Sequence, residues 1–106
     1  VGINCADEAE AERTAQMFST VFGWEYKPGN SSVFSGTAVE CMKTPYLGER
    51  GHIAVGTNNV DRAMYHLGLH GITFDESTRK TDAKGKTKAI YLKDSFCGFA
   101  VHLVQK

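Results

Sequence analysis

Three ionisable side chains, Glu40, His52 and His102, interrupt apolar stretches of this chain that have β-strand character. A carboxylate or an imidazolium is costly to bury alone, and a cation held between such groups removes that cost. One carboxylate and two imidazoles suit Zn, Ni, Mn or Fe, and they leave coordination positions open for water or substrate oxygens. The residue types therefore predict a divalent-metal site formed by these three side chains.

The stretches that carry these side chains belong to an internal duplication. Residues 53–56 match residues 1–4 at an offset of 52, and residues 96–102 match residues 34–40 at an offset of 62 with four of seven positions identical. Self-similarity of this kind indicates two copies of a unit of about 50 residues. Glu40 and His102, the last residues of the second pair of matching segments, are therefore repeat-equivalent. Because side chains alternate along a strand, each of the two lies on one defined face of its strand.

Each copy predicts a β-α-β-β-β module. In the first copy, Asp7 is a candidate N-cap, an apolar stripe follows along a helix, and Gly23 ends that helix. In the second copy, Asn58 or Asn59 caps the helix and Gly71 closes it. The expected strands are residues 1–5, 24–26, 32–35 and 37–42 in the first copy, and residues 51–56, 72–74, 89–93 and 99–104 in the second.

One polar segment lengthens the second copy. Residues 75–88 include the turn-forming run Asp82–Lys86, which predicts an exposed β-hairpin extension. The expected organisation is a single domain with module one at residues 1–43, a linker at 44–50 and module two at 51–106. The expected fold class is α+β, with both modules contributing to a curved, mixed, eight-stranded sheet assembly.

Composition limits the class of protein. The chain has 106 residues, one domain's worth, with 12 basic and 12 acidic residues, so neither nucleic acid nor a membrane is expected as a partner. No apolar run approaches the roughly 20 residues of a membrane helix. Cys5, Cys41 and Cys97 are predicted to be reduced core residues of a cytoplasmic protein. Because the chain does not begin with Met, a removed segment or an upstream domain remains open.

Simpler interpretations exist for each ionisable residue. Glu40 could stand on an edge strand facing water, His52 could be an exposed histidine at a strand start, and His102 could be a hydrogen-bonded core histidine. These alternatives weaken when all three residues fall at matching places in a duplicated unit. His66 and His70 near the end of the second helix complement its dipole. The basic run within residues 79–88 forms a solvated face or attracts an anionic substrate.

The paired modules, and Ala38-Val39-Glu40 followed by Gly51-His52-Ile53-Ala54, resemble the vicinal oxygen chelate superfamily. This superfamily includes glyoxalase I, fosfomycin- and bleomycin-resistance proteins, methylmalonyl-CoA epimerase and extradiol dioxygenases, and its fold is the glyoxalase/bleomycin-resistance/dihydroxybiphenyl-dioxygenase fold. The resemblance implies that Glu40 is the last-strand ligand of module one and His52 the first-strand ligand of module two. His102 stands where the family often has a Glu that is also the general base. The fourth ligand would precede Val1, and we expect a histidine there.

A narrower resemblance is to the glyoxalase-like domain at the C-terminus of some bacterial 2-keto-3-deoxy-6-phosphogluconate aldolases, which implies an upstream aldolase domain. The family implies a metal-dependent lyase or isomerase that acts on a small oxo- or hydroxy-carbonyl substrate through a metal-stabilised enediolate, with Glu40 as a catalytic residue. The alternative is a non-catalytic small-molecule-binding or accessory domain. A homodimer is expected, with the modules paired within or between chains. The substrate walls would be Trp24, Phe34, Tyr91 and Phe99.

Overall fold

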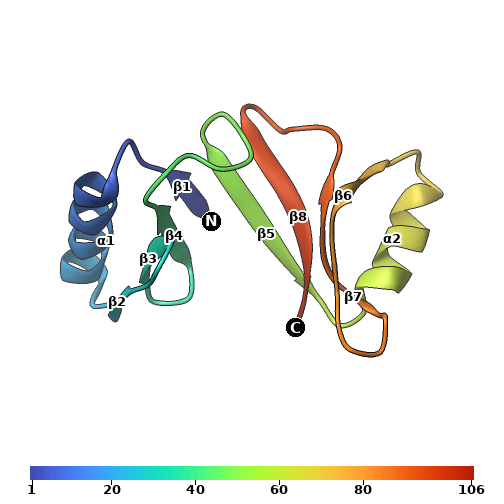
Figure 1. The fold of residues 1–106 in the computed structure, drawn as a ribbon, viewed down its shortest axis with the longest axis horizontal. Coiled ribbons are helices and arrows are strands. Elements are labelled where there is room, and N and C mark those ends of the chain that lie inside the picture. Colours follow the sequence, from blue (N-terminus) through green and yellow to red (C-terminus); the bar gives the residue numbers. More distant parts are fainter. The chain divides into compact units, whose positions relative to one another are not determined.

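The computed structural model describes residues 1–106, which form eight strands and two helices (Figure 1). The order of elements is β-α-β-β-β followed by β-α-β-β-β, as the internal repeat predicts. In chain order the elements are β1 (Gly2–Asn4), α1 (Glu8–Phe22), β2 (Tyr26–Pro28), β3 (Ser32–Ser35), β4 (Val39–Met42), β5 (Gly51–Thr57), α2 (Val60–Gly68), β6 (Phe74–Thr81), β7 (Thr87–Leu92) and β8 (Phe99–Gln105).

The strand order repeats the duplication of the sequence. The strands form one mixed sheet in the order β2-β3-β4-β1-β5-β8-β7-β6, so each copy places its first strand beside its last. The predicted α+β fold with an eight-stranded mixed sheet is confirmed. The chain divides into two compact units, residues 1–52 and 53–106, and the division falls within β5. Gly51 and His52 belong to the first unit because they pair with β1.

Local signals set both ends of α1. The Asp7 side chain accepts a hydrogen bond from the Glu10 N–H at 2.8 Å, and the Glu10 carboxylate accepts one from the Ala6 N–H at 2.8 Å. At the other end, Gly23 has φ of 73° and its N–H donates to the Ser19 carbonyl at 2.9 Å. The predicted cap and the predicted end are both confirmed, because the carboxylate satisfies an orphan N–H and glycine adopts the left-handed conformation without a Cβ penalty.

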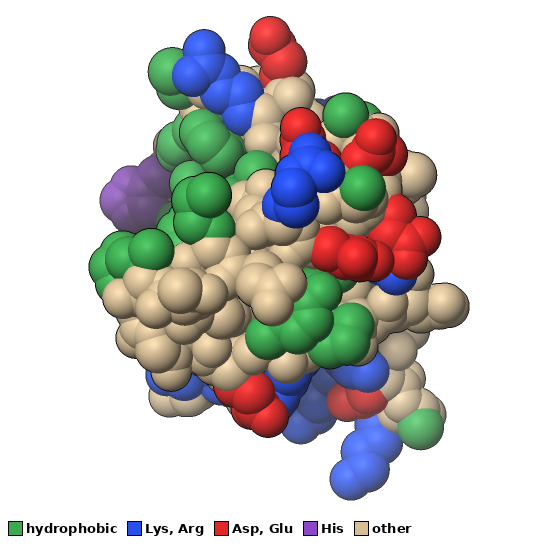
Figure 2. Space-filling model, turned by 90° about the vertical axis from the view of Figure 1, so that its left-hand side faces the viewer, with side chains coloured by type: hydrophobic (Ala, Val, Ile, Leu, Met, Phe, Trp, Pro, Cys, Tyr) green, Lys and Arg blue, Asp and Glu red, His purple; other side chains and the backbone are tan.

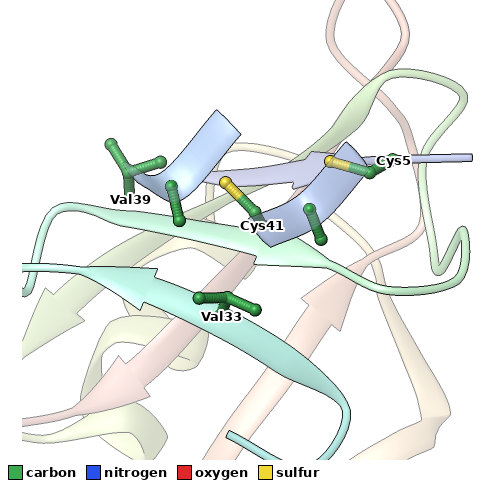
Figure 3. Close-up of a cluster of buried hydrophobic side chains, with 6 residues drawn as sticks. Cys5, Val33, Val39 and Cys41 are labelled. Atoms are coloured by element: carbon green, nitrogen blue, oxygen red, sulfur yellow. The ribbon is translucent and has the colours of Figure 1, made fainter. Parts of the chain in front are cut away.

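The core of the first unit lies between α1 and its strands (Figure 1). Ala11 and Ala15 of α1 have no exposed surface, and these small side chains let the helix approach the sheet closely. Opposite them, the sheet contributes one apolar face, part of which is drawn in Figure 3. The buried residues of this face are Cys5, Val33, Val39 and Cys41.

Trp24 extends the helix packing instead of starting a strand. Its ring stacks on Phe22 and Phe18, with centroids 5.0 and 6.2 Å apart. The predicted strand start at Trp24 is therefore wrong by two residues, and β2 begins at Tyr26. Figure 2 views the molecule from the side on which Figure 1 draws α1, and it shows hydrophobic side chains at the surface. Val21 and Phe22 of α1 are more than half exposed.

The second unit is built in the same way around α2. The Asn59 side chain accepts a hydrogen bond from the Arg62 N–H at 3.0 Å and so caps the helix as predicted. Val60 on the first turn is fully buried, and it packs with Ile90 of β7 and Leu103 of β8. One face of these strands is thus covered by α2.

The end of α2 departs from expectation. The helix ends at Gly68, whereas Gly71, predicted to close it, lies three residues further on with φ of 84°. The N–H groups of His70 and Gly71 bond to the Leu67 and Gly68 carbonyls, so tight turns replace the last helical turn. Neither helix combines the length and the apolar character that crossing a membrane requires.

The polar segment 75–88 forms a hairpin, as predicted, and it does so by lengthening two strands of the module. Where only residues 72–74 were expected as a strand, β6 runs from Phe74 to Thr81 and pairs antiparallel with β7. At the turn, Asp82 Oδ1 accepts from the N–H groups of Lys84 and Lys86 at 2.8 and 3.0 Å.

A carboxylate ties this hairpin to α2. Asp61 accepts hydrogen bonds from Thr87 Oγ1 at 2.7 Å and from the Thr87 N–H at 3.2 Å, and Arg79 lies 3.6 Å away. The hydrogen bond from the Thr87 side chain, the one from its backbone and the Arg79 charge together hold the pKa of Asp61 below its ordinary value. Asp61 therefore stabilises the fold more when it is ionised than when it is protonated.

We expect the stability advantage of the native chain over Asp61→Asn to depend on pH. The advantage is fully present above the ordinary carboxyl pKa of 3.8, and it is lost as the pH falls through the lowered pKa of the folded state. Urea unfolding of both chains at neutral and acidic pH measures it, with the exposed Asp94→Asn as the control. An advantage of equal size at both pH values would contradict the assignment.

The three cysteines divide into two classes. Cys5 and Cys41 are buried, whereas Cys97 is exposed with φ of 51°, so the prediction that all three are core residues is wrong for Cys97. Cys97 lies in the turn before β8, where no element covers it. Burial raises the pKa of Cys41 to about 11, and burial likewise raises the pKa of Cys5. All three are free thiols.

Thiol labelling of the native chain at mildly alkaline pH should therefore modify Cys97 quickly and the other two slowly, because the thiolate is the reactive species. The measurement is the number of thiols modified by a chromogenic disulfide before and after unfolding in urea. One fast thiol in the native chain and three in the unfolded chain are expected. Rapid labelling in native Cys97→Ser would contradict this division.

Candidate functional site

Two of the three predicted ligands meet in the first unit. Glu40 on β4 and His52 on β5 are the residues directly opposite Gly2 of β1, one on each side of it. The His52 Nε2 atom lies 3.2 Å from Glu40 Oε1. His52 is only 6% exposed and the Glu40 side chain 25%. The alternatives in which these residues face water separately are therefore wrong.

A serine holds the other oxygen of the carboxylate. Ser32 Oγ on β3 donates to Glu40 Oε2 at 2.7 Å, and Ser32 is buried. The pairs Ser32 with Met42 and Phe34 with Glu40 make Ser32 a diagonal neighbour of the carboxylate. The sequence places Ser32 in a strand, but only the register of the β3–β4 hairpin reveals that it reaches Glu40.

This network lies on the sheet face that α1 does not cover. Val39 and Cys41, the neighbours of Glu40 along β4, are buried in the core against α1. Side chains alternate across a strand, so Glu40 points to the opposite face. Its directly opposite residue on β3 is Phe34, which is 37% exposed and is one of the four predicted substrate walls. Trp24, another of them, packs on α1 instead.

His102 occupies the matching position in the second unit. It lies directly opposite Tyr91 of β7, and the two rings stack with centroids 4.5 Å apart and planes 9° apart. Leu103, its neighbour along β8, packs against α2, so His102 and Tyr91 face away from that helix. Each unit thus places an aromatic residue across from the repeat-equivalent ionisable one. Phe99, the fourth predicted wall, lies four residues before Leu103 on β8. Side chains an even number of residues apart share a face, so Phe99 is on the α2 side of the strand.

Asn4 anchors the linker within the first unit. Its Nδ2 donates to the Gly48 carbonyl at 2.8 Å and to the Tyr46 carbonyl at 3.3 Å, and its Oδ1 accepts from the Tyr46 N–H at 3.0 Å. Alternation along β1 puts Asn4 on the same face as Gly2. Residues 44–50, expected as a connecting segment, are therefore held against the strand that lies between Glu40 and His52.

The donor set of the first unit fits a divalent cation in part. Two atoms bound to one ion by bonds of about 2.1 Å stand roughly 3.0 to 3.4 Å apart, depending on the bond angle. The 3.2 Å between Glu40 Oε1 and His52 Nε2 falls within that range, and it equally suits a hydrogen bond. Neither unit by itself contains three His, Cys, Asp or Glu side chains grouped to hold a metal ion. The first unit therefore brings together two candidate ligand atoms, a carboxylate oxygen and an imidazole nitrogen.

No protein-family model matches the chain, and no curated protein matches it. Solved structures that resemble it include a member of the glyoxalase/bleomycin resistance protein/dioxygenase superfamily from Sphaerobacter thermophilus, at 20% identity and a TM-score of 0.39, with 100% of this chain and 94% of that one covered. TnmS3, an antibiotic-binding protein from a Streptomyces species, has 18% identity and a TM-score of 0.39, with 99% of this chain and 91% of that one covered. An integron cassette protein from the mobile metagenome of V. cholerae has 18% identity and a TM-score of 0.38, with 98% of this chain and 90% of that one covered. Similarity at this level does not assign a function.

We expect Ser32→Ala to lower the free energy of unfolding by about 1 to 3 kcal/mol, because a partly buried carboxylate loses a charge-assisted hydrogen bond. Urea unfolding with an unchanged m-value is the measurement. The matched control is Ser31→Ala, since Ser31 is exposed and contributes only its backbone carbonyl. Equal effects of the two substitutions would mean that Ser32 does not hold Glu40.

Proposed function

We propose that this chain is a glyoxalase-like, metal-dependent domain that moves a proton next to the carbonyl group of a small oxo- or hydroxy-carbonyl compound, as a lyase or isomerase. The observation that carries the proposal is the 3.2 Å approach of Glu40 and His52 on the sheet face that the helix leaves open. A carboxylate and an imidazole in this arrangement are the donors that Zn, Ni, Mn and Fe accept. His102, the repeat equivalent of Glu40, is the proposed further ligand.

A divalent ion held by these residues would act as a Lewis acid that lowers the cost of negative charge on adjacent substrate oxygens. The chain itself supplies the group that moves the proton. Glu40, once its Oε1 is displaced from the ion, would accept a proton from the carbon next to the carbonyl and return it to the neighbouring carbon, and the Ser32 bond to Oε2 would keep the carboxylate oriented. The His52 imidazole, almost fully buried, lies 3.2 Å from that oxygen.

Cation binding tests the ligand set directly. Titration of the apo chain with Ni²⁺ or Zn²⁺ in a calorimeter should give saturable binding, and Glu40→Gln, His52→Ala and His102→Ala should each weaken it about tenfold or more. His66→Ala is the matched control, because His66 is an exposed histidine on α2. Binding of the same strength in Glu40→Gln would contradict the proposed site.

Proton transfer tests the reaction. Deuterium uptake from D₂O at the carbon-bound protons of dihydroxyacetone, followed by NMR, should be faster with the loaded chain than with buffer and the same metal. EDTA should abolish the acceleration, Ni²⁺ or Zn²⁺ should restore it, and Glu40→Ala should lack it. Acceleration that persists in EDTA would exclude the metal-dependent mechanism.

The second candidate is a non-catalytic small-molecule-binding or accessory domain. The observation that favours it is that Glu40, His52 and Ser32 already form a continuous hydrogen-bonded network. In this role the exposed Phe34 would contribute an aromatic wall for an apolar ligand. Absence of saturable Ni²⁺ and Zn²⁺ binding would favour this candidate over the enzyme.

Two further proposals concern partners. We propose a homodimer, for which sedimentation should give twice the chain mass of 11.6 kDa. We also propose that the domain accompanies a 2-keto-3-deoxy-6-phosphogluconate aldolase. The support for this association is the sequence resemblance alone, and a change in the kinetics of such an aldolase when the domain is removed would test it.

A further inference from the structure

Gly2 occupies the central position of the Glu40–His52 arrangement. It lies on β1, which is parallel to β4 on one side and antiparallel to β5 on the other, and it is directly opposite both ionisable residues. Residues that are directly opposite share a sheet face. A side chain at position 2 would therefore stand between the carboxylate and the imidazole.

The spacing of strands makes this position critical. Neighbouring strands lie about 4.8 Å apart, so the backbones of Glu40 and His52, with β1 between them, are separated by about twice that distance. Side chains that stood perpendicular to the sheet would not meet across such a gap. The 3.2 Å between Nε2 and Oε1 therefore requires the two side chains to lean toward each other over β1.

The imidazole fills the space above Gly2. A Cβ atom built on Gly2 would come closer than 3.0 Å to Cε1, Nδ1 and Nε2 of His52, a separation that real Cβ atoms essentially never show. All three atoms belong to the imidazole, so the ring itself lies over Gly2. We propose that Gly2 is a positioning residue: its missing side chain is the slot in which the His52 ring crosses β1 to reach Glu40.

The requirement for glycine is steric and not conformational. Gly2 is absent from the glycines with positive φ, so the backbone of β1 accepts an L-residue at this position. Gly51, by comparison, has φ of 150°, and a substitution there would combine backbone strain with overlap. Gly2→Ala therefore changes one thing, the space available to the imidazole.

A double-mutant cycle tests the slot without any metal. Gly2→Ala in the native chain should lower the thermal unfolding midpoint, because the His52 ring must leave its place. In the His52→Ala background the same substitution should cost little, because the added methyl group occupies space that the ring has vacated. Gly68→Ala is the matched control, since a Cβ on Gly68 meets nothing within 4 Å.

Each outcome of the cycle decides the proposal. If Gly2→Ala alone does not fold, recovery of folding in the double variant supports the slot. An unchanged midpoint in the single variant overturns it. An equal loss in the native and His52→Ala backgrounds also overturns it.

Cation affinity supplies a readout that a merely structural role would not move. This part rests on the proposed function: Ni²⁺ binding should weaken about tenfold in folded Gly2→Ala and be unchanged in Gly68→Ala. Native-like affinity in folded Gly2→Ala overturns positioning of the ligand pair. If the unsubstituted chain binds no Ni²⁺, the proposed function fails, and the thermodynamic cycle still decides whether Gly2 positions His52.

Discussion

The placement of β1 between β4 and β5 is the constraint on which the site in the first unit depends. A carboxylate and an imidazole whose strands are not neighbours meet because the strand between them carries no side chain at the crossing point. Gly2 pairs with Glu40 on one side and His52 on the other, and the imidazole lies above it. The sheet thereby converts two residues that are 12 positions apart in the chain into a contact of 3.2 Å.

Burial determines which partners the polar atoms of this contact can have. His52 is nearly inaccessible to water, and a polar group in that setting must be satisfied by protein atoms or by a ligand. Ser32 bonds to one oxygen of the Glu40 carboxylate and His52 Nε2 to the other, so these two bonds satisfy both carboxylate oxygens and one ring nitrogen of His52. A cation would compete with the second bond and leave the first in place. The balance between hydrogen bonding and ligation therefore separates the enzymatic proposal from the binding-domain proposal.

The two units show which features of the duplicated module are shared and which differ. Both cover one sheet face with a helix and leave an ionisable residue of the last strand on the other face. Both place an aromatic residue directly across from it, Phe34 opposite Glu40 and Tyr91 opposite His102. The difference is chemical: the carboxylate bonds to a serine hydroxyl, whereas the imidazole stacks on a tyrosine ring. The two units therefore share the architecture of the module and differ in the chemistry of these side chains.

The sequence by itself determined the features that neighbouring residues control. Asp7 and Gly23 delimit α1 because caps depend on local backbone groups, and alternation with the internal repeat was sufficient to predict the two modules and to single out Glu40 and His52. Only the tertiary structure decided that Ser32 reaches Glu40 and that Gly2 makes room for His52. It also decided that Trp24 joins α1 instead of β2. These outcomes depend on strand register and on packing between distant segments, and a sequence pattern with a period of two residues does not specify which residues will lie opposite one another.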